Sequence, residues 1–129
     1  MGAIVYGPLN GGWLTGKYQT GAGDQASRAQ RQPDHFDHGQ EAIRAEKLAM
    51  VDRLQTIATD AGLTLTQLAL AFVLDHPAIT AAIIGPRTPA QLDDLLATAA
   101  RGLVLPIGVR DAIDTVAAPA RNVNPADAR

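Results

Sequence analysis

Residues 83–94, with the sequence IIGPRTPAQLDD, combine a glycine turn, an arginine and the start of a helix. Thr88 can cap a helix that begins with a proline, and Gln91 three positions later completes a capping-box pattern. The first turn of such a helix presents free N–H groups and the positive end of its dipole. With Gly85 for close approach and the forked guanidinium of Arg87, the stretch predicts a phosphate site. The alternative is an ordinary strand–helix turn with a solvated arginine, which is common in such units.

A second glycine-rich stretch, residues 11–18, matches part of the P-loop spacing that binds nucleotide phosphates, through Gly11 and the pair Gly16-Lys17. However, Tyr18 stands where a P-loop needs Ser or Thr to hold magnesium. A polar stretch with two glycines follows, whereas a P-loop leads directly into a helix. We therefore expect no P-loop here.

Residues 34–38, with the sequence DHFDH, lie in a polar stretch that extends from residue 18 to residue 40. Their spacing matches no familiar metal motif, and the next histidine is His76. We expect a solvated loop and no metal site. A connection of this length is unusual in a compact domain and indicates a functional flap or disorder.

Hydrophobic periodicity predicts the elements that must position these residues. We expect strands over residues 2–6 and 79–84, the second buried, and helices over residues 41–61, 64–75, 88–100 and 109–117. The alternation predicts an α/β fold with parallel strands. The first two helices should bury stripes made of Ile43, Leu48, Val51, Leu54, Ile57 and Ala58, and of Leu65, Leu68, Ala69, Phe72 and Val73.

Two strands do not make a sheet with covered faces and edges. The sequence therefore predicts that the chain oligomerises or is part of something larger.

Composition excludes several classes of function. The chain has 129 residues, a net charge of −2 and no cysteines, so we expect neither a nucleic-acid-binding surface nor disulfides. The N-terminal residues do not resemble a signal peptide, and no apolar run reaches the roughly 20 residues that span a bilayer. We expect a cytoplasmic protein without a membrane segment.

Three stretches together resemble the aldo-keto reductase family, in its order and spacing. Residues 6–18 (YGPLNGGWLTGKY) resemble the segment after the seventh barrel strand, and residues 65–74 (LTQLALAFVL) resemble the seventh helix. Residues 83–94 resemble the eighth strand and the start of the eighth helix. The most similar group is that of bacterial oxidoreductases related to potassium-channel β-subunits.

The resemblance implies that residues 1–117 form the C-terminal portion of a (β/α)8 TIM barrel, followed by a tail over residues 118–129. Members of the family reduce aldehydes and ketones by hydride transfer from NADPH. By resemblance, residues 8–11 run under the cofactor's phosphates and nicotinamide-side ribose, and Lys17 and Arg28 contact the pyrophosphate. Gly85 and Arg87 would bind the 2′-phosphate, and Gln91 and Asp94 would face adenine and its ribose. The implied cofactor-binding residues are Pro8, Leu9, Asn10, Gly11, Lys17, Arg28, Gly85, Arg87, Gln91 and Asp94.

Two positions depart from the family pattern. The family usually has Ser at the position of Gly7 and Asn at the position of Leu95, whose side chain neither donates nor accepts. Each lost hydrogen bond is expected to weaken cofactor binding by about 1 kcal/mol.

The family's catalytic Asp, Tyr, Lys and His lie in the first half of the barrel, and no residue here matches them. We therefore expect no catalytic residue in this chain and no carbonyl reduction by it alone. One interpretation is the cofactor-binding part of an NADPH-dependent reductase whose substrate is a small carbonyl compound. The alternative is a non-catalytic remnant that binds nucleotide or a partner chain, as an oligomer or with a complementary barrel half.

Overall fold

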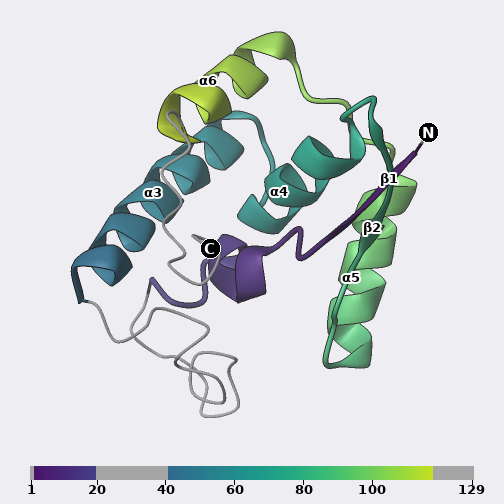
Figure 1. The fold of residues 1–129 in the computed structure, drawn as a ribbon, viewed down its shortest axis with the longest axis horizontal. Coiled ribbons are helices and arrows are strands. Elements are labelled where there is room, and N and C mark those ends of the chain that lie inside the picture. The colour runs from purple at the N-terminus through teal and green to yellow at the C-terminus, as the bar shows by residue number, and fades with distance from the viewer. Residues whose placement is uncertain (1, 20–40, 118–129) are drawn as a thin grey trace.

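The computed structural model describes residues 2–19 and 41–117 of the chain (Figure 1). Its order is strand, 3-10 helix, two α-helices, strand and two α-helices. The periodicity predicts the strands and the α-helices, and the 3-10 helix was not predicted. The elements are β1 (Ala3–Tyr6), η1 (Asn10–Thr15), α3 (Glu41–Asp60), α4 (Leu65–Leu74), β2 (Ile79–Ile83), α5 (Pro89–Ala100) and α6 (Ile107–Ala117).

The two strands pair in parallel, which confirms the predicted α/β class. Tyr6 is in register with Ile83, and Val5 with Ala82. Because register neighbours face the same side of a sheet, the half-buried Val5 and Ala82 share one face. Ile4, Tyr6 and Ile83 lie on the other.

The prediction that the second strand is buried was wrong for the described residues. In β2, Thr80 and Ala81 are exposed and Ile83 is 59% exposed. On β1, Ile4 is 68% exposed and Tyr6 85%. An apolar, β-branched composition indicates that a strand can pack in a buried sheet. It does not indicate whether neighbouring strands are present to cover this face.

Helix α4 lies at the centre of the described structure, where it contacts α3, α5, β2 and η1 (Figure 1). The predicted capping box is present at its start: Gln67 N donates to Thr64 Oγ1 over 3.1 Å, and Thr64 N donates to Gln67 Oε1 over 3.0 Å. Gly62, with a φ of 69°, ends the preceding segment in the left-handed conformation that a glycine adopts without strain.

Two buried clusters share α3 and α4. One joins Trp13 and Tyr18 to Val51 and Leu65, and Leu54 packs against both clusters. The other consists of Ala58, Leu68, Ala71, Leu105 and Ile113. The first cluster anchors η1 to the helices.

The predicted helix faces are largely confirmed. Val51, Ala58, Leu65, Leu68 and Ala69 are buried as expected. Phe72 is a correction, because it is 36% exposed. Leu70 and Ala71, which the predicted stripe omits, are buried instead. The side chain of Ile43 lies outside the described part.

Within the described residues, no single helix is long and apolar enough to cross a membrane. The helices Arg44–Asp60 and Leu65–Leu74 together have the length and apolar composition of a membrane span, but they are bent by 86° where they meet.

Asp75, at the end of α4, ties this helix to α6 and to the segment before it. One carboxylate oxygen accepts hydrogen bonds from Leu105 N, at 3.1 Å, and from the Arg110 guanidinium. The same guanidinium donates to the carbonyl oxygen of Asp75 at 3.1 Å. Sequence reasoning missed this link because its partners are 30 and 35 residues away.

We predict that this link fails in acid. The Arg110 bond first, and then the Leu105 bond, hold the pKa of the Asp75 carboxyl below its usual value. A lowered folded-state pKa gives stabilisation that is complete above the unfolded pKa of about 3.9 and is lost as pH falls through the folded pKa. Asp75→Asn should therefore lower the free energy of unfolding at neutral pH, and its difference from the unsubstituted protein should shrink in acid.

Urea unfolding at about pH 7 and about pH 3 measures both differences. Asp114→Asn, at an exposed position on α6, is the matched control. A difference for Asp75→Asn that is independent of pH would contradict the prediction.

Candidate functional site

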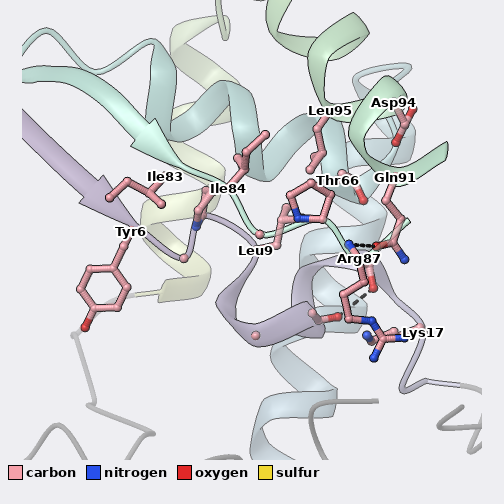
Figure 2. A pocket seen from close by; sticks show the side chains of 17 residues that line it. Tyr6, Leu9, Lys17, Thr66, Ile83, Ile84, Arg87, Gln91, Asp94 and Leu95 are labelled. Carbon is pink, nitrogen blue, oxygen red and sulfur yellow. Dashed lines mark hydrogen bonds between the residues drawn. The ribbon is translucent and has the colours of Figure 1, made fainter. Parts of the chain in front are cut away.

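A cleft of about 530 Å³ lies beyond the carboxyl ends of β1 and β2, where the segments that follow the two strands face each other (Figure 2). Parallel strands bring their carboxyl ends to the same edge, so residues far apart in the sequence meet here. The lining consists of Tyr6, Gly7, Pro8, Leu9, Gly11, Gly12, Thr15, Lys17, Thr66, Ile83, Ile84, Gly85, Pro86, Arg87, Gln91, Asp94 and Leu95.

The predicted site residues gather in this cleft, apart from two. Eight of them line it: Pro8, Leu9, Gly11, Lys17, Gly85, Arg87, Gln91 and Asp94. Asn10 is absent from the lining, and its φ of 46° instead helps to turn the chain. Arg28 lies outside the described residues, as does the DHFDH run.

The β1 side of the cleft is a tight turn made with left-handed residues. Gly7, Gly11 and Gly12 have φ values of 67°, 64° and 102°, a region that glycine enters without a steric cost. Asn10 N donates to Gly7 O at 2.8 Å, and Gly12 N donates to Leu9 O at 2.9 Å. These bonds close the turn, which includes the first residues of η1, and Trp13 of η1 anchors it in the core.

Lys17 reaches the cleft across the surface of this turn. A Cβ atom at Gly12 would lie 2.8 Å from both Cε and Nζ of Lys17. The ammonium group also lies 4.9 Å from the centre of the Tyr18 ring, within the range of a cation–π contact. The glycine therefore leaves room for the lysine as well as making the turn.

The same geometry agrees with the sequence argument against a P-loop. Gly16 follows η1 with a φ of 77°, and residues 17–19 form a turn. A P-loop would begin a helix at this point.

The β2 side of the cleft ends at the N-terminus of α5. Thr88 caps the helix as predicted, since Gln91 N donates to its Oγ1 over 3.2 Å. The reciprocal half of the capping box was predicted wrongly. Gln91 Oε1 accepts from Arg87 N, at 2.9 Å, rather than from Thr88 N. The glutamine therefore binds the residue that carries the cation.

Charged groups mark one end of the cleft, and apolar groups form its wall. Figure 2 shows Lys17 and Arg87 at the end where Gln91 also lies, with Asp94 one helical turn further along α5. Leu9, Ile84 and Leu95 supply apolar surface between this end and the strands. The arrangement can hold an elongated ligand with an anionic group at one end.

Sequence reasoning missed part of the lining. Thr66 reaches the cleft from the first turn of α4, and Ile83, Ile84 and Pro86 reach it from the end of β2. Parallel pairing could have indicated the β2 residues, because they follow the strand directly. Nothing in the local sequence singles out Thr66. Leu95, which stands where the family usually has Asn, also lines the cleft and is only 5% exposed.

Among the described residues, no group of three or more His, Cys, Asp or Glu side chains could hold a metal ion.

Comparison with known proteins gave a family match and several relatives. The family model described as "Aldo/keto reductase family" matches residues 1–117. A probable voltage-gated potassium channel subunit beta from Arabidopsis thaliana is 32% identical over 94 residues, which are 73% of this chain and 28% of the relative. An uncharacterized oxidoreductase, YrpG, from Bacillus subtilis is 31% identical over 97 residues, which are 74% of this chain and 26% of the relative. The chain thus spans about a quarter of the length of these relatives.

We predict that Gly12→Ala destabilises the protein and displaces Lys17. A side chain at a φ of 102° is strained, and the new Cβ would collide with the end of Lys17. Backbone strain of this kind costs roughly 1–3 kcal/mol. Urea unfolding gives the loss of stability. Gly85→Ala is the matched control, because nothing lies within 4 Å of its Cβ position. Equal stability of the two variants would contradict the account of this turn.

Proposed function

Because the chain belongs to the aldo/keto reductase family, we propose that residues 1–117 supply the NADP(H)-binding part of a reductase that acts on aldehydes or ketones. The observation that carries the proposal is the Arg87 turn at the capped N-terminus of α5, within the same cleft as Lys17. When bound, the cofactor supplies the hydride. The described residues of this chain bind and orient it.

The cleft suits a dinucleotide phosphate in charge and shape. Arg87 and the α5 N-terminus form an anion site for the 2′-phosphate, because a guanidinium fits phosphate oxygens and helix N–H groups add to the attraction. From the β1 side of the cleft, at the same end as Arg87, Lys17 is placed for the pyrophosphate, and the glycine turn lets backbone approach it. The apolar side chain of Leu95 offers a surface for a flat ring.

The cleft volume of about 530 Å³ falls within the usual range for small-molecule and cofactor sites. Asp94 and Gln91 lie on α5 beside the anion site, where a carboxylate can accept from ribose hydroxyls and an amide can contact a base. The proposal gives these residues a binding role and assigns no catalytic residue to the chain.

Two relatives, from Arabidopsis thaliana and Schizosaccharomyces pombe, are named as potassium channel subunits. These names favour a second candidate, a non-catalytic module that binds nucleotide within an assembly. Oxidation of NADPH by an aldehyde distinguishes the two functions when the chain is assembled with the rest of a barrel, because the chain alone is expected to supply no catalytic residue. Turnover by that assembly supports the reductase, and saturable NADPH binding without turnover supports the module.

We also propose that the exposed face of Ile4, Tyr6 and Ile83 is covered by further strands of a (β/α)8 barrel. The relatives extend far beyond the matched segment and are long enough to provide such strands. An uncovered apolar face beside two open strand edges is unusual for a protein in water.

The Arg87 site gives a direct prediction. Adenosine 2′,5′-bisphosphate and 5′-AMP share the adenosine, and only the first carries the 2′-phosphate. Charge-assisted hydrogen bonds contribute about 1.5–3 kcal/mol, so Arg87→Met should weaken 2′,5′-bisphosphate binding roughly 10- to 150-fold and change 5′-AMP binding little. Calorimetric titration measures both affinities.

Arg101→Met, at an exposed position at the other end of α5, is the control for the loss of a positive charge. If Arg101→Met and Arg87→Met weaken 2′,5′-bisphosphate binding equally, long-range charge explains the effect and the assignment of Arg87 fails.

The covered face is tested with Ile4→Lys. If barrel strands cover this face in the working protein, a buried ammonium there should abolish NADPH binding or soluble expression. Ile107→Lys, at a position 79% exposed and outside the sheet, is the matched control. Unchanged NADPH binding and unchanged solubility in Ile4→Lys would show that this face stays in contact with water.

A further inference from the structure

We infer that Gln91 is a positioning residue, which fixes the backbone at Arg87 and so sets the direction of the guanidinium at the anion end of the cleft. The inference rests on the proposed function for its consequence, the recognition of a 2′-phosphate. The claim that Gln91 fixes the Arg87 backbone rests on hydrogen bonds of the structure alone.

The hydrogen bonds form a closed loop around the turn. Gln91 Oε1 accepts from Arg87 N at 2.9 Å (Figure 2). Gln91 N donates to Thr88 Oγ1 at 3.2 Å. Leu92 N donates to Thr88 O at 3.1 Å, which joins the same turn to the helix. The backbone of Arg87 is thereby connected to the first turn of α5 through one side chain.

A comparison within the chain shows what is particular to this glutamine. In α4, Gln67 occupies the equivalent position, and its Oε1 accepts from the N-cap residue Thr64. In α5, the accepted N–H belongs to the residue before the N-cap, Arg87. The same side chain that completes a helix cap in α4 therefore reaches one residue further in α5 and holds the cation-bearing residue.

The hydrogen bond to Arg87 N restrains a backbone segment that has no regular secondary structure. Residues 84–88 lie between β2 and α5, outside any helix or strand. A backbone without ladder bonds has more conformations to lose when a ligand binds, and prior ordering reduces that cost. A fixed Arg87 backbone thus favours tight binding of the anion that the guanidinium meets.

The bond also fixes which way the Gln91 amide faces. Because Arg87 N is a donor, Gln91 must present its oxygen to the turn, and its Nε2 lies on the other side of the amide (Figure 2). The Nε2 donor takes no part in the bond to Arg87, so it can contact a ligand acceptor without releasing Arg87.

The first test needs no ligand. Gln91→Met keeps the length of the side chain and removes the acceptor, whereas Gln91→Glu keeps the acceptor. Amide hydrogen exchange at Arg87, followed by NMR, should speed up about fivefold in Gln91→Met, as expected for the loss of an ordinary hydrogen bond. It should stay near the unsubstituted rate in Gln91→Glu. Equal Arg87 exchange in the unsubstituted protein and in Gln91→Met would overturn the inference.

The second test separates positioning from a general loss of structure. Gln67→Met removes the matching bond in α4, and Gln67 does not line the cleft. We expect Gln91→Met to lower the ratio of 2′,5′-bisphosphate affinity to 5′-AMP affinity about fivefold, and Gln67→Met to leave that ratio unchanged. A ratio unchanged in Gln91→Met, or lowered equally in both variants, would overturn the positioning role. If the unsubstituted protein binds neither nucleotide, the proposed function fails, and the exchange measurement still decides whether Gln91 holds Arg87.

Discussion

The parallel pairing of β1 with β2 is the constraint on which the rest of the structure depends. The strands are separated by more than seventy residues of sequence, and they lie in register from Ile4 with Ala81 to Tyr6 with Ile83. This register brings the glycine turn and the Arg87 turn to one edge. A shift of one residue would exchange the two faces of a strand and move the lining residues Tyr6 and Ile83 away from the cleft.

Different interactions hold the two sides of the cleft in place. Helix α4 contacts both β2 and η1, so the two sides of the cleft are connected through one element. On the η1 side the connection is a buried apolar cluster around Trp13 and Leu65. On the α5 side, hydrogen bonds of Thr88 and Gln91 within the turn order the backbone before the helix. The site is thus preorganised by packing at one end and by single hydrogen bonds at the other.

Much of the fold could be predicted from the sequence, because its signals are local. Apolar periodicity predicted the helices, and the pair Thr64 and Gln67 predicted a capping box that is present in the structure. What could not be predicted depends on distant groups, such as the bond from Arg110 to Asp75 or the reach of Thr66 into the cleft. The burial of β2 was predicted wrongly because composition shows what a strand can pack against, not whether that neighbour is present. The partner of the Gln91 side-chain oxygen was predicted as Thr88 N and is Arg87 N, because sequence spacing alone does not distinguish these two adjacent N–H groups.

The claim at the centre of this account is that the cleft recognises the 2′-phosphate of NADPH. The most direct measurement is a calorimetric titration of the purified, folded protein with NADPH, and with NADH under the same conditions. We predict saturable binding of NADPH, with an affinity at least about tenfold above that of NADH, as expected for one charge-assisted hydrogen-bonded contact to the extra phosphate. Equal affinity for the two cofactors, or no binding of either by folded protein, would contradict it.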